Sequence, residues 1–254
     1  MITEYHRPEA LETALKLLRR KTPATRPLGG GTILSAPAAE SVAVVDLQHL
    51  KLNKIALRGK TLHIGATATL QSLLDTDGLQ PALPTAINHE ATYNLRQVAT
   101  VAGTLVVAGG RSPFAAAMLA LDAQLDIQPK DESLAYGELL ALRTEKLRGK
   151  LITKINISTA PKLSYQYVAR TPADLPIVCI ALAQWPSGRT RLAVGGFGAA
   201  PVLALDGRDP SGLIEALENA LSNASDQWGS AEYRLEAGKA LLKRAIADLQ
   251  GTHA

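Results

Sequence analysis

Two short glycine-rich segments, about seventy residues apart, constrain this chain more than any other feature. The first is Leu28-Gly29-Gly30-Gly31-Thr32-Ile33-Leu34, and the second is Ala99-Thr100-Val101-Ala102-Gly103-Thr104. Where Cβ atoms are missing, a phosphate can approach main-chain N–H groups to hydrogen-bonding distance. Neither segment has the G-x-G-x-x-G spacing of a Rossmann turn or the G-x-x-x-x-G-K-[ST] spacing of a P-loop. The sequence therefore predicts a pyrophosphate cradle built differently from both.

Each segment alone also fits a simpler interpretation. Gly29-Gly30-Gly31 could be a mobile loop, and Ala102-Gly103 could let a strand pack closely against a neighbour. Two features favour the cradle: apolar, strand-like sequence flanks both segments, and threonine hydroxyl groups at positions 32, 100 and 104 could bind an oxyanion. A third cluster, Gly195-Gly196-Phe197-Gly198, follows a hairpin strand and predicts a tight bend.

Composition limits the class of protein. The chain has 254 residues, 46% of them hydrophobic, which suffices for one large domain or two moderate ones. Its net charge is +4, but the charges are mixed, and six Tyr, two Trp and two Phe offer little for base stacking, so we expect no nucleic-acid partner. No apolar stretch approaches the length of a membrane span, and no leader-like segment begins the chain, so we expect a cytoplasmic protein.

Few side chains fit a role in catalysis, redox chemistry or metal binding. Cys179 is the only cysteine, which excludes an internal disulfide and an iron–sulfur cluster held by this chain alone, and its apolar neighbours predict a buried thiol. The five histidines, at positions 6, 49, 63, 89 and 253, lack metal-ligand spacing, and no G-x-S-x-G elbow occurs. We therefore predict neither a metal site nor a catalytic side chain.

Hydrophobic patterning predicts a small βαβ-like unit at the N-terminus. Apolar residues recur at helical spacing over residues 8–20, and residues 42–47 form an apolar run typical of a buried parallel strand. The next part mixes strands and helices, with Thr69 as an expected N-cap. Its predicted strands are 62–66, 125–127 and 151–157, and its predicted helices follow Thr69 and cover 81–89 and 114–121. The second glycine segment is expected to lead into a further strand over 105–108.

A turn-like break at Thr159-Ala160-Pro161 is the expected domain boundary. After it, strands are predicted near 165–167, 176–185, 189–194 and 202–205, and a helix over 230–249 with Ser230 as its cap. Strands grouped before helices indicate an α+β fold. We expect a domain over residues 1–160, divided at about residue 56, and a C-terminal α+β domain over 161–254.

Read from end to end, the chain resembles the FAD-binding medium subunit of the molybdenum hydroxylases, the family of carbon monoxide dehydrogenase and xanthine dehydrogenase. The resemblance rests on the two glycine segments, on residues 62–69 and 117–123, and on three C-terminal motifs: Arg170 with Asp174, residues 192–202, and Ser230-Ala231-Glu232-Tyr233-Arg234. It implies a two-part FAD-binding domain of the PCMH type, with a small βαβ unit and a larger mixed sheet with helices. A smaller domain of antiparallel strands and helices follows.

The resemblance also implies a site. FAD would lie between the two domains with its pyrophosphate at the two glycine segments, and Pro113, Ile152 and Gln166 would lie near the flavin. Four positions depart from the family pattern: Ala102 replaces glycine, Thr104 asparagine, Ile33 an acid and Pro113 an aspartate. Because backbone donors do not depend on the side chain, we still expect bound FAD.

Partners follow from the same resemblance. Electrons would leave a substrate on a large molybdopterin subunit, cross a small [2Fe-2S] subunit, and pass through FAD on this chain to NAD or another acceptor. Two alternatives stay open. One is a flavin-free structural subunit of such a complex, and the other is a free-standing FAD oxidoreductase that acts directly on a small substrate.

Overall fold

The computed structural model describes residues 1–36 and 41–251, and its chain divides into two compact units. The first unit contains residues 1–76, 93–106 and 124–156, and the second contains residues 77–92, 107–123 and 157–254. Each is therefore assembled from segments that are distant in the sequence. The domain boundary expected near residue 160 stays a prediction.

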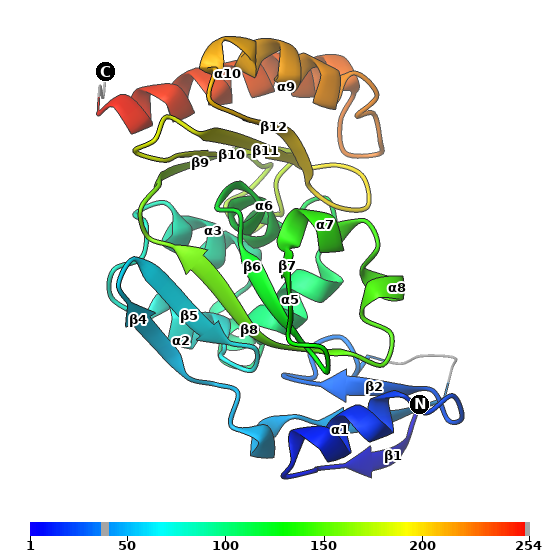
Figure 1. Ribbon diagram of the computed structural model, residues 1–254. Coiled ribbons are helices and arrows are strands. Elements are labelled where there is room, and N and C mark those ends of the chain that lie inside the picture. Colours follow the sequence, from blue (N-terminus) through cyan, green and yellow to red (C-terminus); the bar gives the residue numbers. More distant parts are fainter. Residues whose placement is uncertain (37–40, 252–254) are drawn as a thin grey trace. The chain divides into compact units, whose positions relative to one another are not determined.

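A three-stranded parallel sheet opens the first unit, in the order β1-β3-β2 (Figure 1). Its elements are β1 (Ile2–His6), α1 (Leu11–Leu18), β2 (Thr25–Leu28), β3 (Val42–Asp46) and the 3-10 turn η1 (Gln48–Leu50). All five residues of β3 are buried, because β3 is the central strand and α1 packs its apolar side against it. The predicted βαβ unit is confirmed.

A five-stranded sheet follows in the same unit, in the order β4-β5-β8-β6-β7. Its strands are β4 (Ile55–Arg58), β5 (Thr61–Gly65), β6 (Gln124–Gln128), β7 (Glu132–Ala135) and β8 (Leu151–Ser158). The accompanying helices are α2 (Leu70–Leu74), α4 (Tyr93–Arg96), α5 (Val101–Val107), α7 (Tyr136–Leu140) and α8 (Arg143–Lys146). Thr69 caps α2 as predicted, accepting a hydrogen bond from the Ser72 amide.

The second unit is built around an antiparallel sheet in the order β12-β11-β10-β9. Its strands are β9 (Lys162–Val168), β10 (Val178–Gln184), β11 (Thr190–Gly195) and β12 (Val202–Gly207). Its helices are α3 (Leu83–Glu90), α6 (Pro113–Ala120), α9 (Leu213–Leu221) and α10 (Ala231–Gln250), with the 3-10 turn η2 (Pro210–Gly212) before α9. Ser230 caps α10 as predicted.

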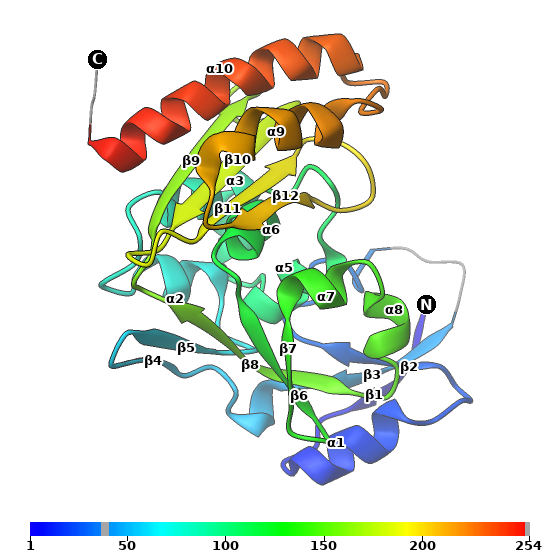
Figure 2. The same ribbon diagram turned by 45° about the horizontal axis from the view of Figure 1, so that its top comes forward.

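Residue size along β10 explains how this sheet is covered. Val178, Ile180 and Leu182 belong to the core formed with α9 and α10. The residues between them are small and lie on the opposite face, where the alanine-rich helix α6 packs. Figures 1 and 2 both show α9 and α10 on one side of the sheet and α6 on the other. Cys179 is fully buried, as expected, and burial raises the pKa of its thiol to about 12.

An ion-pair cluster lies at the β11–β12 edge of this unit. Arg191, which is only 4% exposed, places Nη1 2.9 Å from Asp122 Oδ1 and 2.7 Å from Asp206 Oδ2. Arg189 adds a bidentate pair with Asp206 at 2.7 Å. The two aspartates thus neutralise two guanidinium groups, one of them buried.

Candidate functional site

The first glycine segment presents its main chain rather than its side chains. Gly31 has a φ of +73°, and the Ser35 amide donates to the Gly31 carbonyl at 3.0 Å, which closes the turn. Within residues 1–36 and 41–251, the six amides from Gly29 to Leu34 donate to no acceptor. The Ile33 side chain is 58% exposed. The segment therefore offers a run of unpaired N–H donors.

The two glycine segments meet in the first unit. A Cβ atom added at Gly30 would lie 1.7 Å from the carbonyl oxygen of Val98, and one added at Gly29 would lie 2.7 Å from Thr100 Oγ1. At Gly30 only glycine permits this approach, because any other residue would force the two main chains apart, whereas the contact at Gly29 is with a side chain. The predicted juxtaposition of the two segments is thus present.

The second segment differs from its predicted structure. It forms the first turn of helix α5 and does not lead into a strand at 105–108. Thr100 Oγ1 accepts from the Gly103 amide at 3.2 Å, and its carbonyl accepts from the Thr104 amide at 2.9 Å. The Val101 and Ala102 amides donate to the residue 68 and 66 carbonyls. These four amides are used within the protein, so the second segment supports the first instead of offering donors of its own.

Hydroxyl groups in the two segments have different surroundings. Thr104 Oγ1 donates to the Thr100 carbonyl at 2.9 Å, so its proton is already engaged. The Thr32 side chain is exposed and donates to no acceptor in the described part of the chain. Thr32 therefore fits the expected hydroxyl donor better than Thr104 does.

The other predicted cofactor contacts lie on separate elements. Ile152 is buried in β8 opposite Ile127 of the same unit. Pro113 and Gln166 belong to the second unit: Pro113 is buried at the start of α6, and Gln166 Nε2 donates to Asp248 Oδ2 at 2.6 Å. The roles of these three residues toward a cofactor stay predictions.

Asp46 is a buried acid beside the end of the strand that leads into the first glycine segment, and the residue patterns alone did not reveal its hydrogen bonds. It pairs in register with Leu28, is 3% exposed, and accepts hydrogen bonds from Tyr5 Oη, Arg7 Nε at 2.9 Å and the Gln48 amide at 2.9 Å. Burial alone would raise the pKa of this carboxyl, but these hydrogen bonds outweigh it and lower the pKa. The sequence signal that could have revealed Asp46 is an acidic residue at the end of an apolar run.

This arrangement fits a pyrophosphate. Three consecutive residues lack Cβ atoms, six adjacent amides are unpaired in the described structure, and a second segment fixes their position through direct backbone contact. No group of three or more His, Cys, Asp or Glu residues that could hold a metal ion occurs within residues 1–36 and 41–251. Over the same residues, every helix is too short or too polar to cross a membrane.

Comparison with known proteins decides the family. Residues 1–159 match the family described as the FAD binding domain in molybdopterin dehydrogenase. The chain belongs to this family. The predicted family, the predicted α+β fold of the PCMH type and the predicted cofactor FAD are thereby confirmed, together with the assignment to FAD-dependent oxidoreductases.

Relatives match over nearly the full length. The chain is 29% identical to the protein YgfM of Escherichia coli strain K12, covering 98% of this chain and 97% of YgfM. It is 26% identical to the carbon monoxide dehydrogenase medium chain of Afipia carboxidovorans, covering 96% and 95% of the two chains. Reconstituted CO dehydrogenase from Oligotropha carboxidovorans contains a chain that superposes with a TM-score of 0.81 at 25% identity, covering 98% of each chain.

Proposed function

We propose that this chain is the FAD-binding medium subunit of a molybdenum hydroxylase complex. In this role it takes electrons from a small [2Fe-2S] subunit, which receives them from a large molybdopterin subunit, and passes them to NAD or another acceptor. The match to a medium chain over 96% of this chain supports the proposal. The expected cytoplasmic location stays a prediction.

One observation carries the proposal: the unpaired amides of Gly29 to Leu34, held against the Val98–Thr100 backbone. Bound FAD supplies the redox chemistry through its isoalloxazine ring. The chain's own part is to bind and orient. Amides of the first segment hold the pyrophosphate, and Gly30 and Val98 fix the segment, whose preceding strand ends at Leu28, paired in register with Asp46.

The cysteine content agrees with an iron–sulfur cluster on a separate chain. Cys179 is the only cysteine in the sequence, and it is fully buried, so this chain cannot ligate an iron–sulfur cluster by itself. Electrons that reach FAD from such a cluster must come from another chain. The match to a carbon monoxide dehydrogenase medium chain over 96% of this chain favours a heteromeric complex over a free-standing oxidoreductase.

Two measurements test the proposal. Purified protein should be yellow, with a flavin spectrum and about one FAD released per chain on denaturation. Co-expression with adjacent genes that encode molybdopterin and [2Fe-2S] proteins should give a stable three-subunit complex in which substrate reduces the flavin. A colourless protein that takes up no added FAD, or a complex whose flavin stays oxidised while its iron–sulfur centres are reduced, would refute it.

A further inference from the structure

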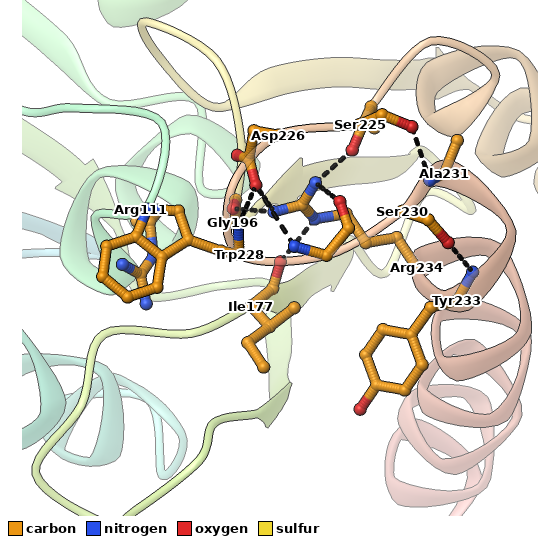
Figure 3. A network of polar contacts seen from close by, with 12 residues as sticks. Arg111, Ile177, Gly196, Ser225, Asp226, Trp228, Ser230, Ala231, Tyr233 and Arg234 are labelled. Carbon is orange, nitrogen blue, oxygen red and sulfur yellow. Dashed lines mark hydrogen bonds and ion pairs between the residues drawn. The ribbon is translucent and has the colours of Figure 1, made fainter.

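Trp228 and two arginines form a cluster in the second unit. Trp228 lies between α9 and α10 and is 38% exposed. The guanidinium carbon of Arg111 lies 4.1 Å from the centroid of its ring system, and that of Arg170 lies 4.5 Å from it. Figure 3 shows Arg111 beside the indole. Two cations thus share one aromatic side chain that remains accessible to solvent.

Neither arginine of this cluster has a carboxylate partner within residues 1–36 and 41–251. Arg111 donates from Nε to the Pro176 carbonyl at 3.0 Å and from Nη2 to the Leu175 carbonyl, so its orientation is fixed while its charge is not neutralised by an ion pair. Arg170 is exposed and makes no hydrogen bond or ion pair in that part of the chain. The donors of Arg170 and Nη1 of Arg111 are left for a ligand.

Nearby acids compensate these charges only in part. Burial, and next the charge of Arg170, lowers the pKa of the Arg111 guanidinium, while Asp226 and Asp174 act in the opposite direction. Asp226 is already bound to Arg234, with Oδ1 2.7 Å from Nη2. An excess of positive charge therefore remains around Trp228.

Hydrogen bonds to buried Arg234 and to Asp226 hold the loop that carries Trp228 in place. Arg234 is fully buried and donates to the carbonyls of Ile177 at 2.8 Å, Gly229 at 2.8 Å, Gly196 at 3.2 Å and Ala224 (Figure 3). The Trp228 amide donates to Asp226 Oδ1 at 2.7 Å. These bonds fix the indole before any ligand arrives, and such preorganisation favours binding.

We propose that Arg111, Arg170 and Trp228 form a binding site for the phosphate group of a small phosphorylated ligand. Guanidinium groups bind phosphate oxygens through paired N–H donors, and stacking on an indole holds their planes in place. Two guanidinium groups without ion-pair partners suit a dianion. None of its three residues belongs to the glycine segments or to the other expected FAD contacts, Pro113, Ile152 and Gln166.

Isothermal titration calorimetry with pyrophosphate tests the site, on protein saturated with FAD so that the glycine segments are occupied. The fluorescence of a Trp185→Phe variant, in which Trp228 is the only tryptophan, gives a second readout. We expect saturable binding and a change in Trp228 emission. Arg170→Gln should weaken binding about tenfold to a hundredfold, because a charge-assisted contact is lost. Arg244→Gln, an exposed arginine on α10, is the matched control and should bind normally.

Four results would overturn the proposal. The first is no saturable binding below about 5 mM, well above the range of specific ligands. The second is equal binding by the Arg170→Gln variant, and the third is equal loss in the Arg244→Gln control. The fourth is saturable binding of a tetraglutamate peptide without binding of pyrophosphate, which would instead make the cluster a docking point for a protein carboxylate. Because Arg170 is exposed and makes no hydrogen bond in the described structure, its variant should fold normally.

Discussion

Replacing Gly30 by alanine tests the contact on which FAD binding depends. The added Cβ would lie 1.7 Å from the Val98 carbonyl oxygen, whereas real Cβ contacts essentially never fall below 3.0 Å. The two segments must therefore separate by about 1.3 Å, the difference between these distances. No rotamer change can relieve this, because both groups are fixed to the main chain.

The expected loss of affinity follows from the hydrogen bonds at stake. A separation of that size would break at least two of the amide–phosphate bonds offered by Gly29 to Leu34. Hydrogen bonds to charged groups contribute about 1.5–3 kcal/mol each, so the loss is about 3–6 kcal/mol. FAD should bind roughly a hundredfold to ten-thousandfold more weakly. Overpacking should also cost about 1–3 kcal/mol of unfolding free energy.

Flavin absorbance after denaturation and titration of apoprotein with FAD measure the effect, and circular dichroism checks the fold. Gly207→Ala is the matched control, because a Cβ at Gly207 meets nothing within 4 Å. Gly29→Ala gives a second comparison: its Cβ would contact the Thr100 side chain at 2.7 Å, so adding Thr100→Ala should restore part of the lost affinity. That second change should not rescue Gly30→Ala.

Normal FAD content and affinity in folded Gly30→Ala protein would refute this reasoning. Equal loss in the Gly207→Ala control would refute it as well, because the effect would then not come from the contact with Val98.

Three further predictions concern stability. Asp206→Ala should lower the unfolding free energy by about 3 kcal/mol in urea titrations, since it removes one counter-charge from buried Arg191; a change below about 0.5 kcal/mol, the range of ordinary surface substitutions, would contradict this. Burial lowers the pKa of His89 despite its hydrogen bond to the Asp174 carbonyl, so the folded state favours the neutral ring and the contribution of His89 to stability should fall as pH drops below about 6.5. A His89→Gln variant should lose part of that pH dependence, and an unchanged profile would argue against it. Asp46→Asn should cost about 1–3 kcal/mol of unfolding free energy, because the Asp46 carboxylate accepts hydrogen bonds from Tyr5 Oη, Arg7 Nε and the Gln48 amide; an unchanged unfolding free energy in urea titrations would contradict it.

Several elements could be predicted from local patterns because local energies decide them. The apolar run at 42–47 can only be buried, and it became the central strand of the parallel sheet. Thr69 and Ser230 precede helices and cap them, because their hydroxyl oxygens accept otherwise unpaired amides. The runs 176–185 and 189–194 were predicted as strands, and Pro186-Ser187-Gly188 between them forms the turn that joins β10 to β11.

Other features depended on partners that are distant in the sequence. The apolar segment 105–108 is short, so its hydrophobic periodicity does not distinguish a strand from a helix. In the structure Thr100 caps helix α5, which extends to Val107. Helix α9 was missed although Leu213, Leu217 and Leu221 have helical spacing, which was a usable signal. The neighbours of Arg234 along its helix are mostly exposed, so the sequence gives no sign that Arg234 is buried. Its guanidinium is buried because the fold brings the Ile177 and Gly196 carbonyls to it as hydrogen-bond acceptors.

The buried Arg234 also determines how the anchoring of the Trp228 loop depends on pH. A guanidinium keeps its charge over the whole pH range in which proteins stay folded. Burial would raise the pKa of its partner Asp226, but hydrogen bonds from Arg234 and from the Trp228 and Gly229 amides lower it, so the carboxylate persists into acid. Anchoring of the indole should therefore stay constant from mildly acidic to neutral conditions.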